Sequence, residues 1–380
     1  MQAQLNTLQD AVRQAAAGRK VLRLRGGGTK DFVGQSLHGE VLDTRSYAGI
    51  ISHEPTELVI TVRAGTPLAE VEAVLAEKGQ SLAFEPPHFG PGATVGGMVA
   101  AGLSGPARAS VGAVRDFILG ARFINGKGED LTFGGQVMKN VAGYDVSRLL
   151  AGSWGTLGII TEVSLKVLPV APAEATLMCA GLAQAPALDL LHRWGGQPLP
   201  LNASAWVHDT TAQPAQDMLF VRLRGAVAAV ESAVTRMSAD AQALGAQVTR
   251  MDNQQVAADW AASREQTLPF FTAPSDDACL WRLSVPQTAP VLELPYAQYI
   301  EWQGAQRWLW APASAAGALR QAVQAVGGHA TLMRTSRSGG EADRGVGVFT
   351  PMSDALQRIQ RNLQQQFDPQ GVFATGRMGA

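Results

Sequence analysis

The sequence has little cysteine and histidine. Its two cysteines, Cys179 and Cys279, lie a hundred residues apart. They cannot by themselves build a disulfide framework, a cysteine-ligated zinc site or an iron–sulfur cluster, so we expect both thiols to be reduced and buried. The six histidines occur singly, without the His-x-x-x-His spacing that binds a metal from one helix. We therefore expect no metal site.

Charge is also scarce. Charged residues make up 17% of the chain, against about 25% in typical soluble proteins, and 31 basic residues nearly balance 32 acidic ones. A chain without an excess of either sign lacks the field that attracts polyanions, which argues against a nucleic-acid partner. Long hydrophobic runs are missing too: residues 93–103 and 149–160 are glycine-rich and shorter than the ~18 residues of a membrane helix. The sequence therefore predicts no transmembrane segment.

The N-terminal residues predict an amphipathic helix with Leu5, Leu8, Val12 and Ala15 on one face, stopped by Gly18. A secretion signal would instead begin with a basic stretch and continue with an apolar one. We expect the protein to be cytoplasmic, reaching the inner face of a membrane only through a complex.

Glycine is plentiful, with 41 residues or about 11% of the chain against ~7% on average. The 380 residues exceed what one hydrophobic core usually holds, so two domains are expected. The glycine-rich part, 1–172, ends near Pro169 and Pro172. Residues 173–345 carry seven of the eight tryptophans and predict an α+β domain, and residues 346–380 predict a helix and a tail that return to the first domain.

A run of glycines follows the first predicted strand, in the segment Arg25-Gly26-Gly27-Gly28-Thr29-Lys30. Residues without side chains let several backbone N–H groups converge on one anion, and Thr29 and Lys30 add further donors. The spacing fits neither the Walker A motif nor the dinucleotide pattern G-x-G-x-x-G. A diphosphate suits this loop, and a plain glycine-rich turn is the alternative.

Further glycine-rich segments follow at Pro91–Gly97, Ser110–Asp116 and Gly152–Thr161. In this order and spacing the set resembles the FAD-binding domain of the vanillyl-alcohol oxidase and p-cresol methylhydroxylase family. Three more stretches, Lys139–Asp145, Ser104–Pro106 and the ending from Phe367 to Met378, are similar to the smaller flavin-binding subunits of bacterial glycolate oxidases. The resemblance implies an α+β fold, with a two-lobed FAD-binding domain and a second, ferredoxin-like cap domain.

The resemblance also implies which residues bind FAD. The pyrophosphate would lie on Arg25, Gly26, Gly27, Gly28, Thr29 and Lys30. The flavin would be lined by Thr94, Val95, Gly96, Gly97, Ala101, Gly102, Ser104, Gly112, Asp116, Gly155, Thr156, Gly158 and Ile160, with Arg377 near the pyrimidine edge. Glycine suits positions 96, 97, 155 and 158 because a β-carbon would hold the main chain away from a flat ring. Family members usually carry Glu where this chain has Trp154.

Covalent flavin attachment in this family needs a His near the pyrophosphate loop or a suitably placed Cys. Neither occurs between residues 25 and 30, so we expect non-covalent FAD. Oxidation of an alcohol also needs a base, and a hydroxy acid needs a cation for its carboxylate. Weak catalytic candidates are Arg334, Arg337 and His329, although Glu341 and Asp343 nearby favour a solvated mixed-charge loop.

Two functions remain open. In the first, the chain is the FAD subunit of a multi-chain glycolate (2-hydroxy acid) oxidase or dehydrogenase, in which a larger homologous flavin subunit oxidises glycolate to glyoxylate and an iron–sulfur subunit takes the electrons. The concentrated tryptophans would then give an aromatic surface for a partner. In the second, the chain is a self-sufficient FAD oxidoreductase that acts on a small hydroxy acid or alcohol.

Overall fold

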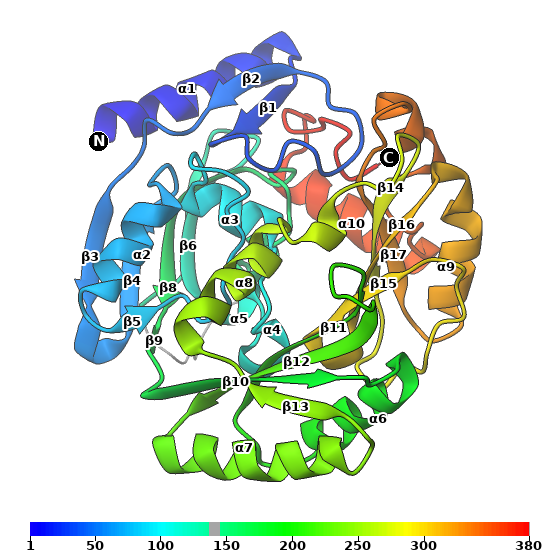
Figure 1. The fold of residues 1–380 in the computed structure, drawn as a ribbon. Helices are drawn as coiled ribbons and strands as arrows, with labels where there is room; N and C mark the ends of the chain where they lie inside the picture. Colours follow the sequence, from blue (N-terminus) through cyan, green and yellow to red (C-terminus); the bar gives the residue numbers. More distant parts are fainter. Residues whose placement is uncertain (137–144, 380) are drawn as a thin grey trace. The chain divides into compact units, whose positions relative to one another are not determined.

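The computed structural model describes residues 1–136 and 145–379, which divide into two compact units (Figure 1). Unit 1 consists of Met1–Ser104, Gly112–Val170 and Pro351–Ala380, and unit 2 of Gly105–Val111 and Ala171–Thr350. The chain therefore leaves unit 1 twice and returns to it each time. No helix in the described residues is both long enough and apolar enough to cross a membrane.

The described residues of unit 1 contain two main sheets and one short strand pair. The first is a parallel pair, β1 (Leu22–Arg25) with β2 (Glu40–Asp43), next to α1 (Gln2–Gly18). The second is antiparallel, in the order β3 (Ile50–Glu54), β4 (Val59–Arg63), β8 (Ile159–Lys166), β6 (Ile118–Ile124) and β7 (Asp130–Gly134). The remaining helices are α2 (Leu68–Ala76), α3 (Val95–Ala101), α5 (Val114–Phe117) and α10 (Asp354–Phe367). The short strands β5 (Gln80–Ser81) and β9 (Leu168–Pro169) pair with each other.

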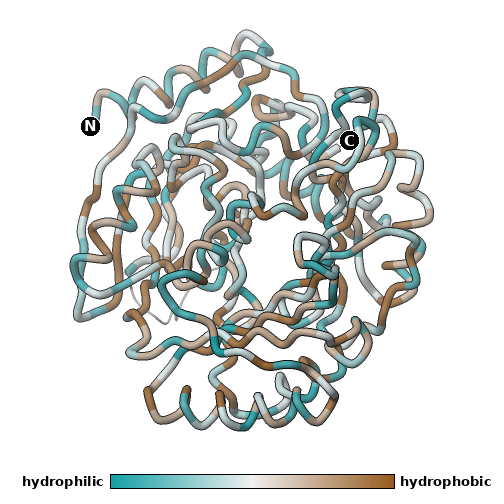
Figure 2. Tube along the Cα trace, viewed as in Figure 1, coloured by the Kyte–Doolittle hydropathy of each residue, from teal (hydrophilic) through white to brown (hydrophobic). Residues whose placement is uncertain are grey.

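The predicted face of α1 is the face that packs. Leu5, Leu8, Val12 and Ala15 are buried in one cluster with residues of β1, β6 and β8 and with Val372 and Phe373 of the tail. Hydrophobic and hydrophilic residues alternate along this helix in Figure 2. Burial of such a stripe stabilises a helix more than its intrinsic propensity does. The first and last segments of the chain thus share one core.

Unit 2 is built on an eight-stranded antiparallel sheet that contains two similar halves. The first half runs β10 (Ala173–Ala180), α6 (Gln184–Gly195), β11 (Leu201–Asp209), β12 (Gln216–Gly225), α7 (Val227–Gln242) and β13 (Gln247–Arg250). Its spatial order β13-β10-β12-β11 is that of a ferredoxin-like βαββαβ unit, as predicted.

The second half repeats this order as β17-β14-β16-β15, and the two halves join between β11 and β15. It contains β14 (Cys279–Ser284), β15 (Gln298–Glu301), β16 (Gln306–Ala311), α9 (Ala316–Gln324) and β17 (His329–Arg334). The first helix of the motif is missing, since residues 285–297 contain none. This internal repeat was not visible in the sequence.

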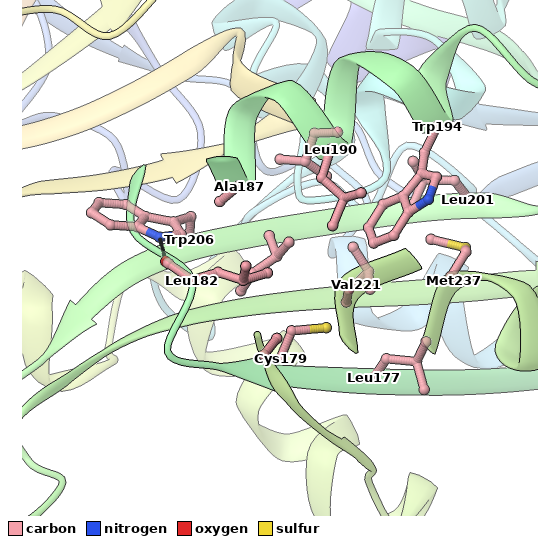
Figure 3. Packing of buried hydrophobic residues seen from close by; sticks show 14 of the residues in the cluster. Leu177, Cys179, Leu182, Ala187, Leu190, Trp194, Leu201, Trp206, Val221 and Met237 are labelled. Atoms are coloured by element: carbon pink, nitrogen blue, oxygen red, sulfur yellow. Dashed lines mark hydrogen bonds between the residues drawn. The ribbon is translucent and has the colours of Figure 1, made fainter. Parts of the chain in front are cut away.

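The two faces of the large sheet differ. Side chains of one face pack against α6, α7 and α9 in two apolar clusters, the first of which is drawn in Figure 3. The opposite face carries polar and aromatic side chains, among them Arg222, Tyr299, Glu301 and Arg282. Helix α8 (Asn253–Glu265) contacts it, since Trp260 hydrogen-bonds Thr176 of β10.

The prediction that the tryptophans form an aromatic surface for a partner is wrong. Six of the seven tryptophans of unit 2 are buried, and the seventh, Trp310, is half-buried. Each indole N–H donates to an acceptor within the unit; Trp206, for example, donates to the carbonyl of Leu182 at 2.8 Å, the dashed line in Figure 3. The others donate to Asp240, Thr176, Ala311, Gly105, Glu301 and Phe270. These residues form the core because a buried indole with a satisfied N–H is stable there.

Candidate functional site

A pocket in unit 1 lies where four segments meet. These are the glycine loop after β1, the start of α3, the turn before β8 and the tail after α10. It is lined by Leu24, Arg25, Gly26, Gly27, Gly28, Thr29, Lys30, Asp31, Thr44, Thr94, Gly96, Gly97, Ala100, Trp154, Gly155, Gly158, Ile159, Ile160 and Arg377. The loop that the sequence singled out thus lines the largest share of the wall.

The glycine loop packs so closely on the neighbouring segment that side chains are excluded. A β-carbon at Gly27 would overlap the carbonyl oxygen of Gly92, and one at Gly26 would lie 2.5 Å from Thr94 Oγ1. Gly28 has a φ of +71°, which glycine adopts without strain. Backbone groups rather than side chains therefore form this wall.

The charged side chains of the loop are held in place. Arg25 Nε lies 2.8 Å from Asp31 Oδ2 at the exposed end of the loop. Lys30 is buried, and its Nζ donates to the carbonyl of His88 at 3.2 Å and lies 5.6 Å from the centre of the Phe89 ring. A fixed ammonium group beside a row of backbone amides is the type of donor set that binds a diphosphate.

The start of α3 forms a second wall. Thr94 is the N-cap residue, and its Oγ1 accepts a hydrogen bond from Gly97 N at 3.2 Å. A β-carbon at Gly96 would lie 2.8 Å from the β-carbon of Ala64, so the helix packs against the end of β4 without side chains between them. Ala100, which also lines the pocket, is one helical turn further on.

Trp154 and Arg377 form a stacked pair in the third wall. The guanidinium carbon of Arg377 lies 4.7 Å from the centre of the Trp154 ring, a cation–π contact. Arg377 is buried, and its Nη2 donates to the carbonyl of Lys30 at 2.7 Å. Trp154 has a φ of +52°, which is unfavourable for a residue with a side chain. Arg377 is thus held between the Trp154 ring and the main chain of the glycine loop.

Seven predicted flavin residues do not line this pocket: Val95, Ala101, Gly102, Ser104, Gly112, Asp116 and Thr156. Val95 and Ala101 are buried on α3. Gly102 ends that helix with a φ of +64°, Asp116 Oδ2 accepts from Ala113 N, and Ser104 Oγ accepts from Val114 N. Gly112 has a φ of +103°, and Thr156 donates to the carbonyl of Ser153.

Sequence reasoning missed Leu24, Asp31, Thr44, Ala100 and Trp154, which line the pocket as well. Helical spacing from Gly96 and Gly97 indicates Ala100 once α3 is known, but no pattern in the sequence marks Thr44. The stretch from Lys139 to Tyr144 lies outside the described residues.

The weak catalytic candidates Arg334, Arg337 and His329 do not line the pocket of unit 1. Arg334 donates to Gln266 Oε1 at 3.0 Å, and the exposed Arg337 lies 3.3 Å from Asp276. His329 is at the exposed start of β17, where desolvation of its ring and the charge of Arg282 lower its pKa. Arg334 and Arg337 therefore have structural partners within unit 2.

The described part of the chain contains no group of three His, Cys, Asp or Glu side chains that could hold a metal. Both cysteines are buried and unpaired with each other. Burial raises the pKa of Cys179 to about 12. Burial, together with a hydrogen bond to Asp343, raises the pKa of Cys279 to about 11. Thiols with such pKa values are poor nucleophiles.

Comparisons with known proteins agree with this geometry. A family model described as an FAD binding domain matches residues 3–144. The chain is 42% identical over 374 residues to the glycolate oxidase subunit GlcE of Escherichia coli K12, covering 98% of this chain and 97% of the relative. It is 31% identical over 141 residues to the glycolate oxidase subunit GlcD of Bacillus subtilis, but covers only 30% of that protein.

Among solved structures, an alkyldihydroxyacetonephosphate synthase superimposes with a TM-score of 0.70 over 96% of this chain and 74% of the other, at 15% identity. At this identity the likeness shows the fold alone, and it confirms the predicted α+β architecture. Given the near full-length match at 42% identity, the chain belongs to the family of the glycolate oxidase subunit GlcE and carries an FAD binding domain.

Proposed function

We propose that this protein is the FAD-binding subunit of a multi-chain glycolate (2-hydroxy acid) oxidase and holds FAD non-covalently in the pocket of unit 1. The observation that carries the proposal is the convergence of the glycine loop, Lys30 and Arg377 on one pocket within the matched fold. The walls supply backbone amides and fixed cations, which fit a diphosphate, and glycines at 96, 97, 155 and 158, which suit a flat ring.

Each wall would have its own task. When bound, FAD supplies a two-electron acceptor. Backbone N–H groups of residues 26–30 and the Lys30 ammonium group would bind the pyrophosphate. Arg377 would keep a positive charge beside the flavin, which favours the reduced, anionic ring. These tasks bind and orient the cofactor.

A base for the substrate is missing from this pocket. The described lining residues include no His, Glu or Tyr, and the one carboxylate, Asp31, is paired with Arg25. A positioned base normally contributes about 10²- to 10⁴-fold to the rate. This supports a division of labour in which the larger flavin subunit oxidises glycolate to glyoxylate and an iron–sulfur subunit accepts the electrons.

The proposal also includes the cellular location of the complex. The complex would act in the cytoplasm, and the chain would reach the inner face of the membrane only through its partners. Two buried, unpaired cysteines support a reducing compartment.

Anaerobic stopped-flow mixing tests the proposal. The isolated, FAD-loaded chain is mixed with glycolate or D-lactate, and flavin absorbance is followed. We expect negligible reduction by the isolated chain and rapid reduction after the partner subunits are added. Reduction of the flavin in the isolated chain at tens per second would contradict the proposal and favour a self-sufficient oxidoreductase. Arg334, Arg337 and His329 would then be the first residues to test.

The bond to the cofactor is tested separately. No His or Cys lines the pocket among the described residues, so acid precipitation should leave all flavin in the supernatant. Flavin fluorescence that stays with the washed pellet would contradict non-covalent binding.

A further inference from the structure

Unit 2 contains a second pocket, which the proposed function does not use. It has a volume of about 420 Å³ and lies on the polar face of the large sheet, between β11, β12, β15, helix α8 and the turn at Pro269–Phe271. Pockets of roughly 300–1,000 Å³ are typical of small-molecule sites. The residues that line the pocket indicate which class of ligand would fit it.

Four aromatic rings line this pocket, those of Phe220, Trp260, Phe270 and Tyr299, and the last three are held by contacts with their neighbours. Trp260 donates to Thr176 Oγ1 at 3.1 Å, and the guanidinium group of Arg222 lies 4.9 Å from the centre of its ring. The rings of Phe270 and Tyr299 are 5.5 Å apart and tilted by 34°. Rigid aromatic walls favour a flat aromatic ligand, because stacking then costs little conformational entropy.

The hydroxyl groups of Ser263 and Tyr299 use their protons within the protein and offer only lone pairs to a ligand. Ser263 Oγ donates to Glu301 Oε1 at 3.0 Å, so its contact with the Tyr299 hydroxyl, also 3.0 Å, must use the Tyr299 proton. Glu301 Oε2 also accepts from Gln306 and Trp308, at 2.9 and 2.7 Å. The free lone pairs of Ser263 and Tyr299 therefore call for a ligand with an N–H or O–H group.

The charges of the wall have one sign. Asp209 and Asp259 line the pocket, whereas no Lys or Arg does so among the described residues. The remaining titratable neighbour, His208, is hydrogen-bonded through Nδ1 to Asp217 Oδ1 at 2.7 Å. The two carboxylates of the wall favour a cationic ligand over a carboxylate ligand. The pocket is therefore unsuited to glycolate or any other small hydroxy acid.

We propose that this pocket is a binding site for an aromatic amine, with the ring against Trp260, Phe270 and Tyr299 and the amino group towards Ser263 and Asp259. The site is independent of the proposed FAD site, because no residue lines both pockets. Failure of either proposal would leave the other intact.

Isothermal titration calorimetry of the full-length, FAD-loaded protein tests the site with two probes that share the indole ring. Tryptamine carries an ammonium group, and indole-3-acetate carries a carboxylate. We expect tryptamine to bind about tenfold more tightly than indole-3-acetate. No binding of tryptamine, or equal binding of the two probes, would overturn the proposal.

Two variants locate the binding. Asp259→Asn removes the exposed carboxylate on α8 and should weaken tryptamine about threefold, with no loss for indole-3-acetate. The matched control is Asp189→Asn, which makes the same change at an exposed position on α6 away from the pocket. Val207→Phe, which fills the pocket from β11, should abolish tryptamine binding. Unchanged affinity in Asp259→Asn would contradict the site even if Val207→Phe failed to fold.

Discussion

Gly27 is the position in the glycine loop where an added side chain would clash most, because its α-carbon packs against the carbonyl of Gly92. Gly27→Asp would force the loop off the Gly92 segment and place a carboxylate beside the pyrophosphate. We expect the purified variant to contain no FAD, measured as the ratio of absorbance at the flavin band to protein. The control is Gly317→Asp, at an exposed glycine of α9 with nothing within 4 Å of an added β-carbon. Stoichiometric FAD in Gly27→Asp would refute the location of the pyrophosphate.

The Trp154–Arg377 stack gives a second prediction for FAD affinity. A cation–π contact of about 0.5–2 kcal/mol holds the guanidinium group in the pocket, so Trp154→Leu should weaken FAD binding about two- to thirtyfold. Arg377→Met should weaken it at least as much, and the double variant should add little to the single ones. Fluorescence titration of the apoprotein with FAD gives the dissociation constants. Fully additive losses would show that the two side chains act separately.

Glu301 predicts how the stability of unit 2 depends on pH. Burial raises the pKa of this carboxyl group, although hydrogen bonds from Trp308, Gln306 and Ser263 oppose the shift. Because the pKa of Glu301 is higher in the folded protein than in the unfolded chain, its protonation stabilises the folded state. This contribution to the free energy of unfolding is complete below the pKa of the unfolded chain, about 4.3, and is lost as pH rises through the pKa of the folded protein.

Glu301→Gln removes this titration and keeps the size of the side chain. We expect the free energy of unfolding of the wild type to fall relative to the variant as pH rises from about 4 towards neutrality, as measured by urea unfolding. A difference between the two proteins that stays constant with pH would contradict a raised pKa.

At the scale of elements, the end of α10 depends on Asp368. Its carboxylate accepts hydrogen bonds from the backbone N–H groups of Val372 and Phe373, at 2.8 and 2.7 Å, and so turns the chain into the core with α1. Asp368→Ala leaves two buried N–H groups without an acceptor, at a cost of about 1–3 kcal/mol each. Thermal unfolding should show a large loss in unit 1, whereas Asp354→Ala, at the exposed first turn of α10, should have a small effect. Equal losses in the two variants would refute this role of Asp368.

Elements with a clear hydrophobic period could be predicted from the sequence. The N-terminal helix is present as α1, and its predicted apolar face of Leu5, Leu8, Val12 and Ala15 is buried. Helix α3 was missed because Gly96 and Gly97, which let it pack closely, also make the segment resemble a loop.

The repeat in unit 2 was missed for a different reason. Its second half lacks the first helix of the motif, so the order of predicted elements differs between the halves although the strand order is the same. At the site, the glycine loop was predictable because a run of residues without side chains is itself a local signal. The contact of Trp154 with Arg377 joins two distant segments and could not be read from local patterns.

For the whole molecule, the division into units gives a prediction about Ser110. This residue lies within the sequence of unit 1 but belongs to unit 2, where its hydroxyl group donates to the carbonyl of Leu201 at 2.7 Å and accepts from Gln303 at 3.2 Å. Ser110→Ala should lower the stability of unit 2 by about 1–2 kcal/mol and leave unit 1 unchanged.

Hydrogen exchange read separately for β11 and β8 measures the two effects. The control, Thr7→Ala, removes an exposed hydroxyl group on α1 that bonds only within its own helix. Faster hydrogen exchange of β8 in Ser110→Ala would show that residues 105–111 stabilise unit 1, which would contradict the prediction.

The return of the chain to unit 1 has a consequence for biosynthesis. The glycine loop and Trp154 leave the ribosome before unit 2 is made, whereas Arg377 follows only after the roughly 200 residues of unit 2 and α10. At about 5–20 residues per second, the pocket stays without Arg377 for roughly 10–40 s of translation. FAD capture should therefore wait until Arg377 has been made, and nascent chains stalled before residue 350 should carry no flavin.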